Sequence, residues 1–210
     1  MNFSIVSPLE KSLISRKHAI ENSDYEEFIS QLYIDLNAKI QDLQQYSSMY
    51  HSLGEDVITV FLVTNLKSMA YNAYHDVYNN GHVDLYVEAG NFKWLGECKL
   101  QGGPKYSQKG FNQLTTRYSD GHELGKCGGI LIYNQKKDKT TLDCMNEWYS
   151  FLEDDSEIKK LELTCALLDP KSNRQYFDSI HKHQKSGMDY KIRHFFVNLS
   201  HNPQDKKDIL

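Results

Sequence analysis

The sequence lacks the features that mark membrane and secreted proteins. Its longest apolar run, residues 57–63, falls far short of the roughly 20 residues that a bilayer-spanning helix needs. The N-terminus has no charged segment followed by an apolar one, as a signal peptide would have. Only four prolines occur, and 40% of the residues are hydrophobic, which is enough for a buried core. We therefore expect a globular, cytoplasmic protein that does not contact a membrane.

Cysteines are also few, and the chain carries no net positive charge. The four cysteines, Cys98, Cys127, Cys144 and Cys165, are widely spaced and form no Cys-x-x-Cys pair, so we expect reduced, apolar side chains and neither zinc ligands nor disulfides. The formal net charge is −4, from 24 Lys and Arg against 28 Asp and Glu. A nucleic-acid partner would therefore need a local basic patch.

The first half of the chain shows helical patterns followed by turn signals. Apolar residues recur at helical spacing over 23–46, which predicts one or two amphipathic N-terminal helices. Residues 55–71 are rich in β-branched side chains, but a run of this length without a turn signal favours a helix. Asn80-Gly81 predicts a tight type I′ hairpin turn. A second turn over 88–91 leads into 92–100, so we expect a three-stranded meander.

The second half predicts a loop followed by helices and strands. Glycine and proline at positions 102–104 predict a loop over 101–110. The elements expected after it are a helix over 111–118, a buried strand over 127–134, a helix over 142–151, a strand over 161–168, a helical turn over 176–183 and a strand over 192–199. His181 and His183 have no second ligand pair at a recognisable spacing, so we expect them in a surface loop.

This order of elements indicates an α/β fold with a mixed central sheet flanked by helices. A chain of 210 residues is long enough for one well-buried core, and we expect Trp94 and Trp148 inside it. We expect a helical N-terminal extension over 1–50, one domain over 51–200 and a flexible tail over 201–210.

Three charged residues lie where the meander should be buried: Asp84, Glu97 and Lys99. Side chains alternate along a strand, so Glu97 and Lys99 project to one face. The turn over 88–91 can bring Asp84 level with Glu97. The simplest alternative is an exposed cross-strand ion pair. Gly96 argues against it, because glycine inside a strand often marks the close approach of another group.

Two neighbouring carboxylates in a half-buried site repel each other, and a divalent cation between them removes the repulsion. Mg²⁺ takes oxygen ligands and keeps waters and phosphates in its shell, so one or two protein carboxylates are enough. We expect Mn²⁺ to substitute. This arrangement suits phosphodiester hydrolysis, in which Lys99 would orient the attacking water or neutralise charge in the transition state.

The pattern of Asp84, a spacer and Glu97-Cys98-Lys99 resembles the D-x(n)-(D/E)-x-K signature of the PD-(D/E)xK nuclease superfamily. Val83 stands where the family name has proline. The resemblance implies a restriction-endonuclease-like αβββαβ core. It further implies Asp84 and Glu97 as metal ligands, the backbone carbonyl of Cys98 as an additional ligand and Lys99 as the catalytic lysine.

Many members of this family carry a glutamate on the first core helix. Glu55 fills that place and would join the catalytic and metal-binding residues, with Asp56 as its competitor. Glu55 shares a helical stripe with Ile58 and Leu62 and so leans toward the core, which favours it. The resemblance covers about residues 54–134.

The helix predicted after the meander carries Lys109, Gln113 and Arg117 at four-residue intervals, which places them on one face. In the family this helix lies beside the site, so we expect these three residues to bind substrate. A solvated helix face is the alternative. Some relatives carry a Gln-x-x-x-Tyr motif there, but here Arg117 takes the tyrosine's place and Tyr118 comes one residue later.

We therefore expect a Mg²⁺-dependent DNA endonuclease in a prokaryotic defence or restriction-like system, a setting that rests on family analogy alone. Loops, a homodimer or a partner protein would supply target recognition. Two alternatives remain open. One is a catalytically silent relative that binds nucleic acid or proteins, against which the intact Asp84, Glu97 and Lys99 argue. The other is a nuclease acting on RNA or on a repair or recombination intermediate.

Overall fold

The computed structural model describes residues 6–166 and 173–205 and has the architecture of an α/β protein. N-terminal helices and further helices between the strands surround a seven-stranded mixed sheet. The expected fold class is thus present, and its details depend on where each helix and strand begins.

Helices begin where the sequence supplies caps, as in the reciprocal capping boxes of Ser7 with Glu10 and of Thr140 with Asp143. The helices are α1 (Pro8–Glu21), α2 (Tyr25–Gln45), α3 (Ser47–Tyr50), α4 (Glu55–Ser68), α5 (Pro104–Asn112), the π-helix η1 (Gln113–Tyr118), the 3-10 turn η2 (Glu123–Gly125), α6 (Thr141–Asp154) and α7 (Ser156–Lys159). The structure confirms three predicted helices, as α2, α4 and α6. Helix α1 falls within the expected helical N-terminal extension, but no separate helix was predicted over its residues.

The strands form one main sheet and one separate hairpin. They are β1 (Asn72–Tyr74), β2 (Val77–Tyr78), β3 (His82–Val83), β4 (Leu85–Ala89), β5 (Phe92–Leu100), β6 (Cys127–Asn134), β7 (Thr164–Cys165), β8 (Tyr176–Lys182) and β9 (Asp189–Asn198). The main sheet has the order β1-β4-β5-β6-β9-β8-β7. Strand β6 runs parallel to β5 and to β9, and the other neighbours are antiparallel. The predicted strands over 127–134 and 192–199 are confirmed as β6 and β9.

The predicted meander is confirmed in part: β4 and β5 pair across the turn over 88–91, whereas the residues that flank Asn80-Gly81 form the separate β2–β3 hairpin. The strand that pairs with β4 on its other side is β1, which precedes this hairpin. This hairpin turns at Asn80-Gly81, as predicted. However, Tyr78 pairs with His82, which leaves three residues in the turn where a type I′ turn has two. Both Asn80 and Gly81 have positive φ angles, of 56° and 149°. Asparagine and glycine tolerate such angles best, so the turn chemistry was predicted correctly although its length was not.

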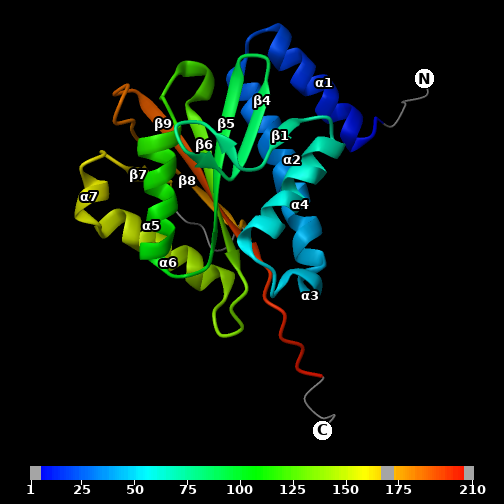
Figure 1. The fold of residues 1–210 in the computed structure, drawn as a ribbon, viewed down its shortest axis with the longest axis vertical. Coiled ribbons are helices and arrows are strands. Elements are labelled where there is room, and N and C mark those ends of the chain that lie inside the picture. The colour runs from blue at the N-terminus through cyan, green and yellow to red at the C-terminus, as the bar shows by residue number, and fades with distance from the viewer. Residues whose placement is uncertain (1–5, 167–172, 206–210) are drawn as a thin grey trace.

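An apolar core lies on each face of the sheet. Figure 1 shows α2 and α4 on one side and α5 and α6 on the other. The first core contains Phe28, Leu62 and Trp94, and the second contains Phe111 and Trp148. Both tryptophans are at most 1% exposed, as predicted. The result is a three-layered arrangement in which both faces of the sheet are covered by apolar side chains. A charged side chain buried on this sheet is therefore unusual.

The loop predicted over 101–110 is wrong, because α5 begins there at Pro104. Proline suits the first helical position, where its missing N–H is not needed. Gly103 turns the chain into the helix with a φ of 91°. The same glycine and proline residues that end β5 therefore also start a helix. The helix predicted over 111–118 is divided between the end of α5 and η1.

The helical turn predicted over 176–183 is wrong, because residues 176–182 form β8. Phe177, Ser179 and His181 are buried and alternate with more exposed neighbours, as on a strand with one covered face. His181 and His183 are each 1% exposed, so their predicted surface position is also wrong. Burial, then the neighbouring His183, lowers the pKa of His181 to about 4, so this ring is uncharged at neutral pH.

Other predictions are confirmed in part. The strand predicted over 161–168 is reduced to β7, and its last two residues lie outside the described part of the chain. All four cysteines are free thiols, and only Cys165 is not fully buried. Within the described residues, no helix is long and apolar enough to cross a bilayer.

Candidate active site

Four of the residues proposed from the sequence meet near the end of β5. Glu97 and Lys99 project from this strand toward the second core, as do their partners on β6, Ile130 and Ile132. They therefore face α5. We call the group formed by Glu55, Asp84, Glu97 and Lys99 the carboxylate cluster.

Asp84 and Glu55 reach the cluster from opposite sides. Asp84 directly precedes β4, whose register pairs Leu85 with Gly96 and so sets Asp84 beside Glu97. Glu55 is the first residue of α4, which packs on the other face of the sheet. Residues from three separate parts of the chain thus converge. An ordinary ion pair on an exposed strand face would not need this convergence.

The ammonium group of Lys99 lies at the centre of the cluster. Its Nζ is 2.7 Å from Glu97 Oε1, 3.3 Å from Glu55 Oε1 and 3.5 Å from Asp84 Oδ2. It also donates a hydrogen bond of 2.8 Å to the carbonyl oxygen of Cys98, the group predicted as a further ligand. One cation therefore faces three carboxyl groups, so the negative groups of the cluster outnumber its positive one and a second cation would be favourable.

Backbone N–H groups of β5 hold the two outer carboxylates. The N–H of Cys98 donates to Asp84 Oδ2 at 2.9 Å, and the N–H of Leu100 donates to Glu55 Oε2 at 2.6 Å. Hydrogen bonds to a charged acceptor are short and strong, and the donors belong to a rigid strand. The positions of both carboxylates are therefore set by the sheet itself.

Glu97 is buried without a hydrogen-bond partner among the described residues. The side chain is fully buried, and its contact with Lys99 is an ion pair that lacks the alignment of a hydrogen bond. Burial, then the negative charge of Asp84, raises the pKa of Glu97 to about 8. Burial alone would lower the pKa of Lys99, but the carboxylates, with Glu97 foremost, raise it well above its ordinary value. A buried carboxyl group in this state is costly to the fold.

The donor atoms of the cluster fit a hard divalent cation. Among residues 6–166 and 173–205, no group of three or more His, Cys, Asp or Glu side chains is arranged to hold a metal ion. Mg²⁺, however, needs only one or two carboxylates beside water and substrate oxygens. Asp84 and Glu97 supply these from adjacent positions, and both oxygens of Glu97 lack hydrogen bonds within the described part of the chain. The residues present therefore suit such an ion.

The two acids at the start of α4 have different surroundings. Glu55 contacts Lys99 and the backbone of Leu100. The side chain of Asp56 is 83% exposed, and its carboxylate lies 3.8 Å from Nε2 of His75. Of the two, Glu55 is the one that the structure brings into the cluster.

The π-helix η1 changes how the predicted substrate-binding residues are arranged. In an α-helix Gln113 would share a face with Arg117, but in a π-helix the residue five positions later takes that place. Gln113 accordingly donates through Nε2 to the hydroxyl of Tyr118, at 2.9 Å. Burial, then Glu97 and Asp84, raises the pKa of Tyr118, which places its hydroxyl in the field of the cluster. Because η1 is a π-helix, Tyr118 lies beside Gln113 although it comes one residue later than in the Gln-x-x-x-Tyr motif.

Lys109 and Arg117 are exposed and do not contact the cluster. The ammonium group of Lys109 lies 5.8 Å from the ring centroid of Tyr106. Both residues flank the α5 side of the site as solvent-exposed cations, and neither reaches the carboxylates.

Two glycines permit close packing against β5: Gly96 on the face of the first core, away from Glu97, and Gly110 against the cluster itself. Only Gly96 was noticed in the sequence. A Cβ atom at Gly96 would lie 2.8 Å from the ring of Trp94, so this glycine permits the approach of that ring. A Cβ atom at Gly110 would lie 2.9 Å from Glu97 Cγ and 3.1 Å from Lys99 Cγ. Gly110 therefore lets α5 pack directly on the two charged side chains. Its position in the sequence, within a predicted loop, concealed this role.

Replacing Gly110 with alanine is expected to displace Glu97 and Lys99, because the new Cβ atom would lie too close to the Cγ atoms of both side chains. We expect a loss of about 1–2 kcal/mol in the free energy of unfolding and a loss of activity of about 10²-fold, since small misplacements at a reacting centre are costly. Urea unfolding and cleavage assays measure the two effects. Gly125→Ala is the matched control, because its nearest neighbour would be 3.8 Å from the new Cβ atom. Equal behaviour of both variants would contradict this role.

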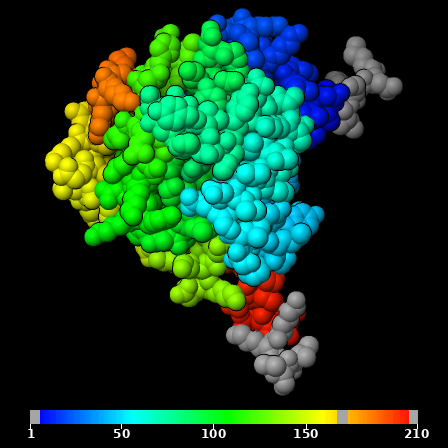
Figure 2. Space-filling model, viewed as in Figure 1, coloured from blue at the N-terminus to red at the C-terminus, as the bar shows by residue number. Residues whose placement is uncertain are grey.

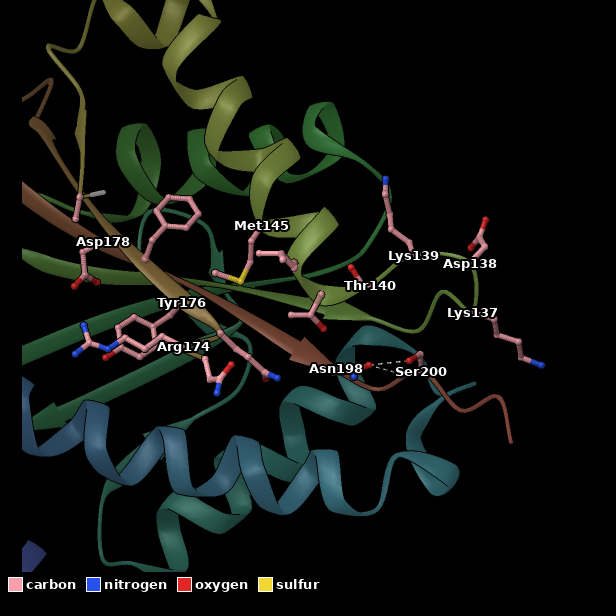
Figure 3. Close-up of a pocket in the computed structure, with 16 residues that line it drawn as sticks. Lys137, Asp138, Lys139, Thr140, Met145, Arg174, Tyr176, Asp178, Asn198 and Ser200 are labelled. Atoms are coloured by element: carbon pink, nitrogen blue, oxygen red, sulfur yellow. Dashed lines mark hydrogen bonds between the residues drawn. The ribbon is translucent and has the colours of Figure 1, made fainter. Parts of the chain in front are cut away.

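A sizeable hollow among the described residues lies elsewhere. Figure 3 shows it beside the start of α6, with Lys137, Lys139 and Asp178 among its lining residues. Its volume is about 800 Å³. No residue of the carboxylate cluster lines it. Its walls include Ala166 and Asn173, which adjoin residues 167–172 outside the described part of the chain. We assign no site to it.

Comparisons with known proteins find no match for this chain: no family model, no curated protein and no solved structure. The fold and the carboxylate cluster are therefore the basis for a functional assignment.

Proposed function

We propose that this protein is a Mg²⁺-dependent nuclease that hydrolyses phosphodiester bonds, with DNA ahead of RNA as substrate and with endonucleolytic cleavage. The observation that carries the proposal is the convergence of Glu55, Asp84, Glu97 and Lys99, in which Glu97 is buried and neither of its oxygens is hydrogen-bonded to another described residue. An unsatisfied buried carboxylate calls for an explanation, and strongly shifted pKa values gather at functional sites. A cation site would account for the buried carboxylate of Glu97 and for the shifted pKa values around it.

The order of elements around the cluster supports a restriction-endonuclease-like αβββαβ core. Helix α4, strands β1, β4 and β5, helix α5 and strand β6 follow one another in that order, with β6 parallel to β5. In this proposal α1 and α2 form a helical extension that packs on the sheet, and the β2–β3 hairpin is an insertion before Asp84.

Asp84 and Glu97 would hold the ion through carboxylate oxygens, with Glu55 and the Cys98 carbonyl beside them. A bound Mg²⁺ supplies polarisation of a phosphoryl oxygen and acidification of a coordinated water. The raised pKa of Lys99 keeps its amine protonated, so this residue donates hydrogen bonds and positive charge and does not act as a general base. It would orient the attacking water or stabilise the charge that develops on phosphate oxygens.

The exposed cations on the α5 side supply the substrate-binding part of the proposal. Lys109 and Arg117 would contact phosphates of the nucleic acid, and Gln113 would position the strand from its fixed place beside Tyr118. Phosphate contacts make binding strongly salt-dependent. A prokaryotic defence or restriction-like role in the cytoplasm, with a homodimer or a partner protein for target recognition, is the corresponding biological proposal.

A binding protein without catalysis is the second candidate. The observation that favours it is the position of Lys99, whose ammonium lies within 3.5 Å of all three carboxylates and so balances much of their charge without a metal ion. Such a protein would bind nucleic acid or a protein partner through the same surface.

Cleavage of a panel of nucleic acids separates the two candidates. Purified protein is incubated with supercoiled plasmid, linear duplex DNA, single-stranded DNA and RNA, with Mg²⁺, with Mn²⁺ or with EDTA. The nuclease proposal predicts cleavage of at least one DNA substrate with either metal ion and none with EDTA. Binding without cleavage under every condition would favour the second candidate.

A further inference from the structure

A hollow lined by tyrosines lies near the carboxylate cluster. Its lining residues are Tyr74, Val77, Tyr78, Asn79, Tyr86 and Glu88, and its volume is about 280 Å³. Tyr78 is 76% exposed and Tyr74 is 38% exposed, whereas Tyr86 is nearly buried. Exposed aromatic rings gathered around a hollow indicate a binding surface. We call this feature the tyrosine hollow.

The tyrosine hollow shares a face of the sheet with the cluster. Tyr86 packs in the second core, toward which Glu97 also projects, and Tyr74 pairs directly with Tyr86. Tyr86 in turn pairs with Leu95, two residues before Glu97 on β5. Tyr86 and Glu97 therefore lie on the same side of these two strands.

The β2–β3 hairpin forms a fixed wall of the hollow. The side-chain amide of Asn79 donates to the carbonyl oxygen of Tyr118 at 3.1 Å. A Cβ atom at Gly81 would lie 2.6 Å from both Arg117 Cδ and Tyr118 Cε1, so the turn sits directly on η1. In Figure 2 the teal surface of residues near 75–85 borders the green surface of α5 and η1. The hairpin is therefore held in place before any ligand binds.

Charges around the hollow favour a base over a phosphate. Glu88 accepts hydrogen bonds from the hydroxyls of Tyr86 and Tyr74, at 3.1 and 3.5 Å, so a carboxylate lies inside and would repel an anion. Lys67 places its ammonium 5.5 Å from the ring centroid of Tyr74, and the exposed Arg117 lies beside the hairpin turn. Cations at the edge suit the phosphates that flank an inserted base.

We infer that the tyrosine hollow stacks one unpaired base of the strand that is cut, so that the preferred substrate is single-stranded or locally unpaired nucleic acid. The inference rests on the proposed nuclease function for the meaning of the neighbouring cluster. Stacking on tyrosine tolerates every base, because each base has an aromatic face. The hollow would therefore select an unpaired base without distinguishing which base it is.

Binding of a short fluorescent strand tests the inference directly. Affinities of wild type and Tyr78→Ala are measured by anisotropy in EDTA for single-stranded DNA, single-stranded RNA and a blunt DNA duplex. We expect Tyr78→Ala to weaken binding of the better single strand about tenfold, with no change for the duplex, and Tyr78→Phe to bind as wild type does. Tyr46→Ala is the control, because Tyr46 is also exposed but lies at the end of α2.

The inference and the proposed nuclease function fail in different ways. Wild-type affinity of Tyr78→Ala for single strands, or no binding of single strands by the wild type, would overturn the inference and leave duplex cleavage untouched. Tyr78-dependent binding of single strands by a protein that cuts nothing with Mg²⁺ would support the hollow and contradict the nuclease. The large exposure of Tyr78 makes misfolding of the variant a minor concern, which thermal melting checks.

Discussion

Replacing Glu97 with glutamine is expected to reduce cleavage by about 10²–10³-fold while making the fold more stable. The carboxyl group is buried, neither of its oxygens is hydrogen-bonded within the described residues, and Asp84 lies beside it. Because the pKa of Glu97 is raised to about 8, folding at neutral pH costs free energy whether this group is buried charged or takes up a proton, and a neutral amide removes that cost. Lys99 retains Asp84, Glu55 and the Cys98 carbonyl as partners. We expect a gain of about 1–2 kcal/mol in the free energy of unfolding.

Urea unfolding in EDTA and cleavage in Mg²⁺ measure these opposite changes. Asp56→Asn is the matched control, because it neutralises an exposed acid near the site and should alter neither quantity. If Glu97 served only as a structural partner of Lys99, its replacement would destabilise the protein, and that result would count against a metal-binding role.

Replacing Lys99 with methionine is expected to lower both activity and stability. Three carboxyl groups would then share a buried site without a cation, which costs about 3–5 kcal/mol in the free energy of unfolding when one partner of a buried pair is removed. Cleavage should fall by about 10²–10³-fold, because the donor that stabilises transition-state charge is gone. The double variant Glu97→Gln with Lys99→Met should recover much of the stability and none of the cleavage.

Lys93 provides the control for this experiment, since it is an exposed lysine on the same strand. Lys93→Met should change the free energy of unfolding by less than about 0.5 kcal/mol and leave cleavage at the wild-type level. A Lys99→Met variant that retains wild-type cleavage would remove lysine from the proposed chemistry.

Elements with strong local signals were predicted from the sequence. The length of the 55–71 segment distinguished α4 from a strand, and Asn80-Gly81 marked the hairpin turn because few residues accept positive φ angles. Helix α5 was missed because Pro104 ends one element and starts the next. Strand β8 was missed because its buried histidines suggested polarity, whereas packing in the second core decides their position.

The centre of the candidate site followed from local spacing, and its surroundings did not. Glu97 and Lys99 share a face in any strand, and one turn suffices to bring Asp84 beside them. Gly110 and Tyr118 could not be assigned in this way. Their roles depend on how closely α5 packs on β5 and on the π-helical register of η1, which arise from tertiary contacts.

Cleavage of supercoiled plasmid DNA by the wild type, Asp84→Asn and Asp56→Asn, with Mg²⁺ or with EDTA, tests the proposed metal-dependent chemistry most directly. We expect the wild type and Asp56→Asn to cut the plasmid only when Mg²⁺ is present. Asp84→Asn should be slower by at least about 10²-fold. Cleavage by Asp84→Asn at the wild-type rate, or cleavage that persists in EDTA, would contradict a metal-dependent site at Asp84.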